Sequence, residues 1–377
     1  MAGFCVAAVL SYFLTFFFIA VSRQLGLLDY PAEIKLHKKP MPFLGGVGVF
    51  LSFWLVIFIG ILGAYFFKTQ APPAAFSVNI LSGILSVVPK VLGIFLGSVV
   101  ILVVGLYDDK FRWSPLRKFA GQVAAVLILM STGLTINFLS PLGLVGGLIT
   151  FFWILLIINA FNFIDSLDGH CAGIALISAV VFFWITQIIH QPLVGFLLIA
   201  LAGALMGFFP HNFKPAKTFL GDNGSLFIGY MMAAFTLLCS YQAPRQTYVT
   251  SLIPVLIFGV PIYDTLSVVT VRIFRGMPPW HGDRNHFAHR LVKIGMSEKV
   301  AVIFSYFVAL ILGFVAILTT QVDLFGAIII GFLFFGIIGA VAFLEFYTTE
   351  RIRIVEELAK KRRRRRADVA EAEEEEL

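Results

Sequence analysis

Long stretches with few or no charged residues recur along the whole chain, and they constrain its fold more than any other feature. An α-helix needs about 20 apolar residues to cross the hydrocarbon core of a membrane. Of the 377 residues, 59% are hydrophobic and only 13% are charged, a composition that excludes an ordinary soluble domain. Because backbone groups inside a bilayer must be hydrogen-bonded within their own segment, such stretches indicate helices. The sequence therefore predicts an all-α, polytopic membrane protein.

We expect about eleven transmembrane helices joined by short connections. One transmembrane domain would cover residues 1–347, followed by a tail over 348–377 that is first basic and then acidic. The first span has no basic segment before it and no small-residue cleavage site, so we expect it to stay in the mature protein. The predicted spans lie near residues 3–22, 46–67, 80–106, 118–138, 143–163, 173–190, 193–210, 223–241, 249–272, 300–320 and 324–345.

The positions of Lys and Arg predict the orientation, because these residues concentrate in cytoplasmic segments of membrane proteins. With the N-terminus outside, only Lys68, Lys90 and Arg245 of the 28 Lys and Arg residues face the outer side. An odd number of spans then places the C-terminus in the cytoplasm. The inner segments also hold nearly every carboxylate, His and Asn, so we expect any chemistry to take place on the inner face.

The net charge of +7 does not indicate nucleic-acid binding, because the positive residues lie along a membrane face with no soluble domain to present them. Attraction to anionic lipid headgroups is the expected consequence. The three cysteines, Cys5, Cys171 and Cys239, are scattered and odd in number, which argues against a disulfide framework.

The first inner loop contains the segment HKKPMPFLGG at residues 37–46. Its two prolines favour an extended turn, and Gly45 and Gly46 permit close approach of the backbone to another segment. Lys38 and Lys39 are candidates for binding a phosphate at the membrane surface. Ordinary lysines of a cytoplasmic loop are the alternative.

Two adjacent carboxylates, Asp108 and Asp109, follow the third apolar stretch. Neighbouring residues on a helix point about 100° apart, so both cannot face one ligand. We expect one to line a site and the other to orient a neighbouring segment. Two solvated surface acids are the alternative.

Four polar residues spaced by three, Asn159, Asn162, Asp165 and Asp168, end the fifth apolar stretch. On a helix they would form one slowly drifting polar stripe. Polar residues inside a membrane or at its edge are energetically costly and usually functional. Because the nearby sequence has no basic residue, the acids favour a metal ion or a cationic partner from another loop.

The segment FLGDNGS at 219–225 places Asp222 between glycines just before a predicted helix. Helix N-termini bind anions, and Mg²⁺ prefers a few carboxylates completed by phosphate oxygens and water. Asp222 is therefore a candidate metal ligand, with helix capping as the alternative function.

The longest inner loop contains HGDRNHFAHR at 281–290. Arg284 suits phosphate binding, and His286 and His289 share one helical face. A zinc site lacks a matched ligand set, and simple surface polarity is the alternative. Asp264 interrupts the preceding apolar stretch, either as a satisfied polar residue at a kink or as a direct contact to the site.

Taken together, these five segments resemble the polyprenyl-phosphate N-acetylhexosamine-1-phosphate transferase family, glycosyltransferase family 4. HKKPMPFLGG, YDDK, NAFNFIDSLDG, FLGDNGS and DRNHFAH follow one another in the family's order. The chain is most similar to the branch of undecaprenyl-phosphate alpha-N-acetylglucosaminyl 1-phosphate transferases. It differs in Ala288, where that branch usually has adjacent histidines, and in Ile34, where a basic residue is common.

The resemblance implies attack of a lipid phosphate on the β-phosphorus of a UDP-sugar, with release of UMP, as the first membrane step of a cell-envelope polysaccharide pathway. It implies Mg²⁺ as cofactor, with Mn²⁺ as an alternative, and a bacterial cytoplasmic membrane with the active site on the cytoplasmic face. The expected partners are UDP-N-acetylhexosamine, polyprenyl (undecaprenyl) phosphate and membrane lipid, without nucleic acid, and a homodimer is one open oligomeric state.

Carried over residue by residue, the resemblance assigns a role to each candidate. The metal ligands would be Asp222 and Asp165. The catalytic residues would be Asp108, Asp109, Asp165 and His286. The substrate-binding residues would be Lys38, Lys39, Asn162, Asp168, Phe219, Arg284 and His289.

A transporter with titrating carboxylates is the main alternative function. Transporters usually carry such groups near the bilayer midplane, often in repeated halves. In this chain the acids collect at one predicted membrane edge, and the sequence contains no repeat. A catalytically inactive scaffold is disfavoured by the intact set of acids.

Overall fold

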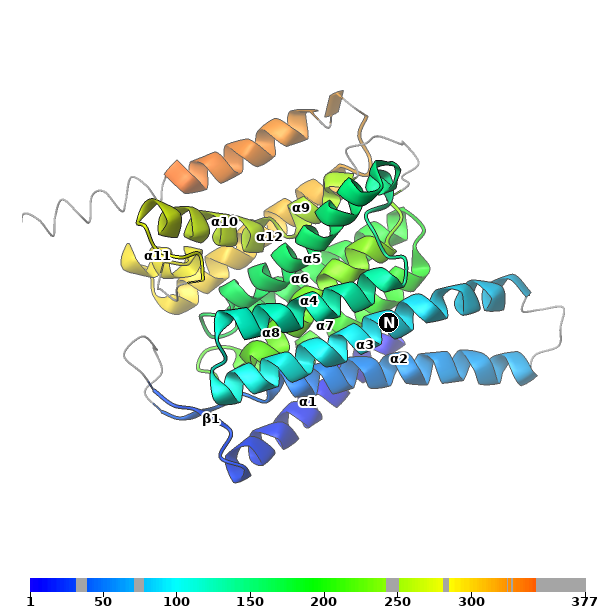
Figure 1. Ribbon diagram of the computed structural model, residues 1–377, viewed down its shortest axis with the longest axis horizontal. Coiled ribbons are helices and arrows are strands. Elements are labelled where there is room, and N and C mark those ends of the chain that lie inside the picture. The colour runs from blue at the N-terminus through cyan, green and yellow to red at the C-terminus, as the bar shows by residue number, and fades with distance from the viewer. Residues whose placement is uncertain are drawn as a thin grey trace, which may run out of the picture.

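The computed structural model describes residues 1–31, 39–70, 78–241, 251–280, 285–323, 325–326 and 328–343. Most of these residues form helices that lie lengthwise beside one another (Figure 1). The elements in chain order are α1 Ala2–Gln24, β1 Leu28–Asp29, β2 Met41–Pro42, α2 Gly45–Gln70, α3 Val78–Phe111, α4 Pro115–Ser131, the 3₁₀-helix η1 Asn137–Leu142, α5 Leu144–Ile164, α6 His170–Ile188, α7 Pro192–Asn212, α8 Gly221–Leu238, α9 Ile253–Ile257, α10 Gly259–Phe274, α11 Phe287–Lys293 and α12 Glu298–Leu318.

Seven of the described helices are long and apolar enough to cross a membrane, which confirms the all-α, polytopic class. Each predicted span coincides with at least one helix, and the last coincides with a shorter apolar helix, Ile328–Phe343. The number of crossings and the orientation of the termini stay predictions. The seven helices are α1, α2 over Gly45–Gly63, α3 over Val87–Phe111, α5, α6, α7 and α12.

Two predicted spans differ from the observed helices. The span at 118–138 is shorter as a helix, because α4 ends at Ser131 and Gly133 follows with a positive φ of 79°. The span at 249–272 is divided at Phe258 between α9 and α10. The interruption therefore precedes Asp264, which lies inside the continuous helix α10.

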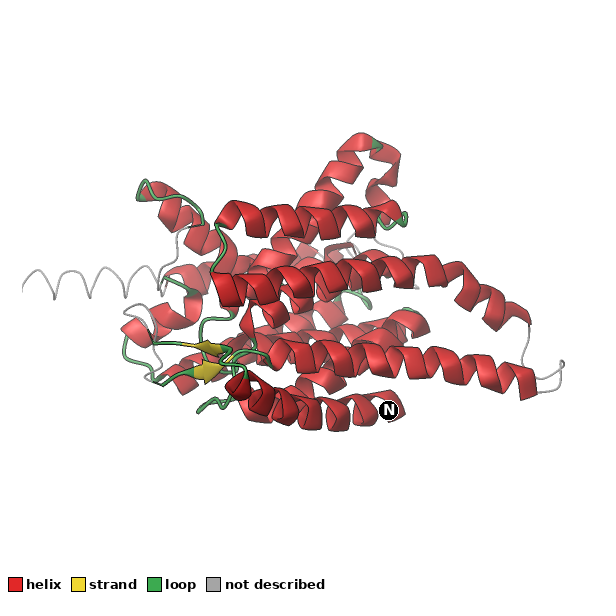
Figure 2. Ribbon diagram, turned by 60° about the horizontal axis from the view of Figure 1, so that its bottom comes forward, coloured by secondary structure: helices red, strands yellow, loops and turns green. Residues whose placement is uncertain are grey.

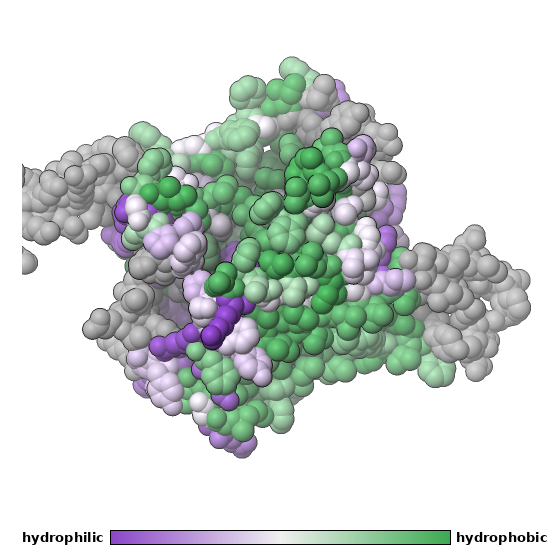
Figure 3. Space-filling view, in the orientation of Figure 1, coloured by the Kyte–Doolittle hydropathy of each residue, from purple (hydrophilic) through white to green (hydrophobic). Residues whose placement is uncertain are grey.

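The core of the bundle is built around α8, nearly all of whose residues are buried. Small residues bring neighbouring helices close, as is typical of membrane bundles. A Cβ added to Gly229 would stand 2.7 Å from the Cα of Ile158 on α5, so glycine is required there. Hydrophobic side chains cover most of the face seen in Figure 3.

The two short strands cover one end of the bundle (Figure 2). They pair antiparallel, with Leu28 opposite Pro42. The carbonyl of Pro42 accepts a hydrogen bond from the amide of Phe219 at 2.8 Å, and the Gly46 amide donates to Leu220 at 3.0 Å. The first inner loop thus lies against the segment before α8, as the paired glycines predict.

Gly46→Ala should lower stability, because the added methyl group overlaps the Cα of Gly224 and the side-chain oxygen of Asn223. Backbone cannot move aside as a flexible side chain can, and such overpacking costs about 1–3 kcal/mol. Gly63→Ala on the same helix is the matched control, because nothing lies within 4 Å of its Cβ position. Thermal unfolding in detergent measures both; equal midpoints for the two variants would contradict the close contact.

Candidate active site

Four helix ends from three separate parts of the chain meet at one end of the bundle. Asp108 lies near the end of α3, Lys118 in the first turn of α4, Asn162 near the end of α5 and Asp222 in the first turn of α8. Successive helices run in opposite directions along the bundle. The ends of α3 and α5 and the starts of α4 and α8 therefore lie on the same side. The structure thus confirms that acids from separate segments converge.

Lys118 lies at the centre of this group. Its ammonium is 2.5 Å from Asp222 Oδ2 and 3.0 Å from Asp108 Oδ2, and it donates to Asn162 Oδ1 at 3.1 Å. The Lys118 side chain is only 18% exposed, so the ion pairs are shielded from much of the solvent. Sequence reasoning places Lys118 among the Lys and Arg residues of the inner face and gives it no role in a site. Its position inside an apolar span, rather than in the loop before it, was the available signal.

The two adjacent carboxylates have separate functions, as their angular spacing predicts. Asp108 faces Lys118 and also accepts from the Trp113 amide at 2.8 Å. Asp109 holds the start of α8, accepting from the amides of Asp222 at 2.9 Å and Asn223 at 3.1 Å. The Asn223 side chain also donates to Asp109 at 2.6 Å. Asp109 thereby positions Asp222; its assigned catalytic role stays a prediction.

Asp222 does not cap its own helix, because Asp109 performs that function. Its carboxylate points instead toward the α4 and α5 side chains, with Asn162 Nδ2 donating to Oδ1 at 2.7 Å. The same Asn162 amide donates to Ser225 at 2.9 Å. The geometry therefore favours the site function of Asp222 over the capping alternative.

The prediction of one helical polar stripe is wrong beyond Asn162, because α5 ends at Ile164. Asp165 and Asp168 lie in the turn that leads to α6. Asp168 accepts from the Ala216 amide at 3.1 Å, which ties this turn to the segment before α8. The predicted span at 143–163 ends within one residue of α5, so only the continuation of the polar stripe through Asp168 was wrong.

Asp165 is half-buried, and its carboxylate has no hydrogen-bond partner among the described residues, although its backbone amide donates to the Asn162 carbonyl at 3.2 Å. Burial raises the pKa of this carboxyl well above its usual value, and the negative charges of Asp222, Asp109 and Asp168 raise it further. These charges act on it because they lie nearby. Asp165 therefore belongs to the same acidic group, and a cation would relieve its repulsion.

A second polar cluster is built on Asp264, which is fully buried in α10. Its carboxylate accepts from the His286 ring, with Nδ1 at 2.8 Å, and from the Phe287 amide at the start of α11. The Asp264 carboxylate fixes the Nδ1–H tautomer of His286 and leaves Nε2 for another partner. Asp264 is thus a satisfied polar residue, as one of the two alternatives predicts, and a direct contact to the site stays a prediction.

Phe163 connects the two clusters, because its ring lies 5.8 Å from the His286 ring and the residue directly follows Asn162. The His289 ring is 6.3 Å from that of His286 and is also buried. Ala288 packs with Leu167 against α12, so this departure from the family pattern lies in the hydrophobic packing.

Of the remaining candidates, Lys38 and Arg284 lie outside the described residues. Lys39 is exposed just before β2. Phe219 is half-buried and its amide is bonded to Pro42, which places it three residues before Asp222 beside the first inner loop.

The metal site stays a prediction: the residues offer oxygen donors of a suitable type but no preformed cage. Among the described residues, no three His, Cys, Asp or Glu side chains are grouped to hold an ion. The Lys118 ammonium already lies where two carboxylates need a positive charge. Oxygen donors from Asp222 and Asp165 fit Mg²⁺, which keeps several waters and usually binds few carboxylates together with substrate phosphates.

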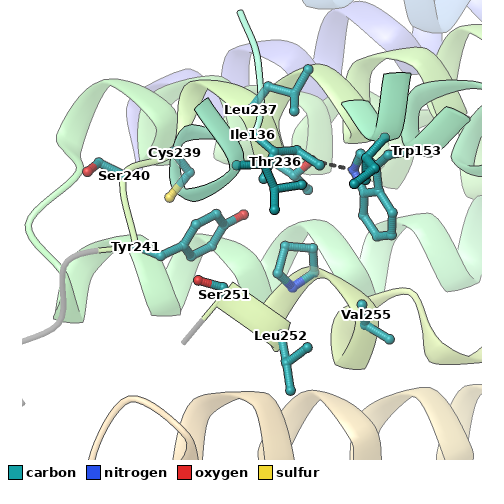
Figure 4. Close-up of a pocket in the computed structure, with 13 residues that line it drawn as sticks. Ile136, Trp153, Thr236, Leu237, Cys239, Ser240, Tyr241, Ser251, Leu252 and Val255 are labelled. Atoms are coloured by element: carbon teal, nitrogen blue, oxygen red, sulfur yellow. Dashed lines mark hydrogen bonds between the residues drawn. The ribbon is translucent and has the colours of Figure 1, made fainter. Parts of the chain in front are cut away.

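A cavity of about 460 Å³ lies at the other end of α5 and α8, between them, η1 and α9 (Figure 4). Trp153 forms part of the cavity wall, and its indole Nε1–H donates a hydrogen bond to Thr236 Oγ1 at 3.0 Å. None of the cavity's lining residues is charged, so it offers no cation to pair with a phosphate. The lining consists of Ile136, Leu139, Ile149, Trp153, Thr236, Leu237, Cys239, Ser240, Tyr241, Ser251, Leu252, Pro254 and Val255.

Comparison with known proteins gives a consistent result. The family model described as glycosyl transferase family 4 matches residues 91–240, which include Asp108, Lys118, Asn162 and Asp222. A probable undecaprenyl-phosphate N-acetylglucosaminyl 1-phosphate transferase of Bacillus subtilis (strain 168) is 30% identical over 321 residues, covering 83% of each chain.

Two further relatives extend the comparison. The decaprenyl-phosphate N-acetylglucosaminephosphotransferase of Mycobacterium tuberculosis (strain H37Rv) is 32% identical, covering 80% of this chain and 77% of the relative. The undecaprenyl-phosphate alpha-N-acetylglucosaminyl 1-phosphate transferase of Escherichia coli (strain K12) is 26% identical, covering 80% and 79%. The similarity thus extends over most of each protein.

Proposed function

The chain belongs to glycosyl transferase family 4, and from this membership we propose that it transfers N-acetylglucosamine 1-phosphate from a UDP-sugar to polyprenyl phosphate. The observation that carries the proposal is the Lys118 ammonium between Asp222 and Asp108 at the meeting point of four helix ends. This is a mixed-charge site that can receive two phosphate groups. The acceptor is undecaprenyl phosphate or a polyprenyl phosphate of similar length.

The reaction forms a bond between an oxygen of the acceptor phosphate and the β-phosphorus of the donor. The bond from the β-phosphorus to the bridging oxygen breaks, and its electron pair leaves with UMP. A phosphate monoester has a second pKa near about 6, so the acceptor is mostly dianionic at neutral pH and needs no strong base. The task of the site is therefore to position two anions and offset their repulsion.

The chain's own groups divide this task. Lys118 offers positive charge to the phosphates, and Asp108 holds the ammonium in place and orients the acceptor. Asp222 and Asp165 would hold Mg²⁺, which when bound neutralises the diphosphate and the charge that develops on UMP. Asn162 keeps Asp222 in position through its 2.7 Å hydrogen bond. The His286 Nε2, Lys39 and the sequence-predicted Lys38 and Arg284 are further phosphate contacts.

We place the site at the cytoplasmic face of a bacterial cytoplasmic membrane. The support is the concentration of Lys and Arg in the segments at that end of the bundle and the bacterial origin of the relatives. A transporter is disfavoured, because the carboxylates lie at helix ends rather than in the middle of the bundle.

The test is transfer by the purified protein in nanodiscs, supplied with labelled UDP-N-acetylglucosamine, undecaprenyl phosphate and Mg²⁺. We expect a lipid-linked diphosphosugar and one UMP for each lipid formed. Chelation should stop both, and added Mg²⁺ or Mn²⁺ should restore them. UDP-N-acetylgalactosamine in place of the donor measures sugar selectivity. Release of UMP without dependence on the lipid would contradict the proposal.

A further inference from the structure

A second polar contact lies one helical turn deeper in the bundle than Lys118. Gln122 Nε2 donates to Asn159 Oδ1 at 3.2 Å, and Asn159 Nδ2 donates back to Gln122 Oε1 at 2.9 Å. Gln122 lies four residues after Lys118 on α4, and Asn159 lies three residues before Asn162 on α5. Lys118 and Gln122 therefore share one face of α4, and Asn159 and Asn162 share one face of α5. The two helices are thus joined by two successive polar contacts.

The Gln122–Asn159 pair has little freedom to rearrange. Gln122 is 1% exposed and is the one polar side chain among the buried residues of α4. The second hydrogen of Asn159 Nδ2 is directed to the Leu155 carbonyl at 2.8 Å. Because an unpaired amide is costly in such surroundings, each side chain holds the other in a single orientation.

The consequence for Lys118 follows from helix geometry. Moving α4 by one residue against α5 would shift its side chains by about 1.5 Å along the axis and rotate them by about 100°. Lys118 makes three contacts of 2.5–3.1 Å to groups on α3, α5 and α8. A shift of this size would break at least one of them.

We propose that Gln122 and Asn159 are positioning residues, which fix the register of α4 against α5 and thereby hold the Lys118 ammonium between Asp108 and Asp222. The role of this pair in placing Lys118 does not depend on which reaction the protein catalyses. The expected effect of the pair on turnover rests on the proposed function. Neither residue needs to touch a substrate.

The experiment measures acetylation of Lys118 by a small amine-reactive reagent, quantified by mass spectrometry on the full-length protein in nanodiscs. Lys110, which is exposed, serves as the internal reference. Gln122→Leu and Asn159→Leu should each raise the Lys118 labelling rate several-fold. The exchanged double variant Q122N/N159Q retains two amides and should return the rate toward that of the wild type.

Leu129→Ala is the matched control, because Leu129 is buried on the same helix farther from the site. It should lower the thermal midpoint without changing Lys118 labelling. Unchanged labelling in folded Gln122→Leu, or an equal rise in Leu129→Ala, would overturn the positioning role, since the pair would then contribute to stability only.

Turnover gives the second measurement. Gln122→Leu should lower kcat with little change in KM for the UDP-sugar, and should cause no further loss in a Lys118→Met background, because both act through one group. A full additional loss in that background would contradict the inference. If the wild-type protein transfers no sugar phosphate, the proposed function fails, and the labelling result still decides the positioning role.

Discussion

Asp222→Asn should reduce transfer by about 10³-fold or more, on the order of the loss from one preorganised electrostatic group. The substitution keeps the size of the side chain and an oxygen that can accept from Asn162, so the local packing should survive. It removes the negative charge that pairs with Lys118 at 2.5 Å and that would bind a metal. We therefore expect a protein that inserts and folds but does not turn over.

Glu298→Gln is the matched control for this substitution. Glu298 lies in the first turn of α12, as Asp222 lies in the first turn of α8, and each pairs with a lysine. The partner of Glu298 is Lys214, and neither residue belongs to the four meeting helix ends. Its activity should stay close to that of the wild type. Near-normal transfer by Asp222→Asn would remove the metal-ligand assignment.

Lys118→Met should reduce turnover by about 10²-fold, because it removes the cation that the site is proposed to offer to the phosphates. It also leaves Asp108 and Asp222 as neighbouring carboxylates without their shared partner. Breaking a fully buried pair costs about 3–5 kcal/mol, and we expect about 2 kcal/mol here because Asp222 is 29% exposed. Transfer kinetics and thermal unfolding measure the two effects.

Lys110→Met provides the comparison for Lys118→Met. Lys110 is an exposed lysine near the same end of the bundle, and its ammonium lies over the Phe111 ring. The two variants lose the same charge, so a general change in surface potential would affect both equally. We expect only Lys118→Met to lose activity, and comparable losses would contradict the central position of Lys118.

Much of the architecture was predictable, because membrane helices are recorded in the sequence as long apolar stretches. The meeting of Asp108, Asn162 and Asp222 also followed from alternating spans that end in polar residues. The separate functions of Asp108 and Asp109 were predictable in kind from their angular spacing. Which of the two faces the site depends on the rotation of α3 against α8, which only packing determines.

The features that sequence reasoning missed depend on tertiary contacts. Lys118 looked like one more cytoplasmic lysine, and only the approach of α3, α5 and α8 makes it the centre of the site. The buried partner of His286 is Asp264, 22 residues earlier, a pairing that no local pattern indicates.

The most direct test of the account is an experimental structure of the protein in nanodiscs with UDP-N-acetylglucosamine and Mg²⁺. We predict the Lys118 ammonium within ion-pair distance of Asp108, Asp222 or the donor diphosphate, with Asp165 beside them, at the cytoplasmic end of the helices. Carboxylates of Asp108, Asp165 and Asp222 that lie apart, or that face opposite sides of the membrane, would contradict it.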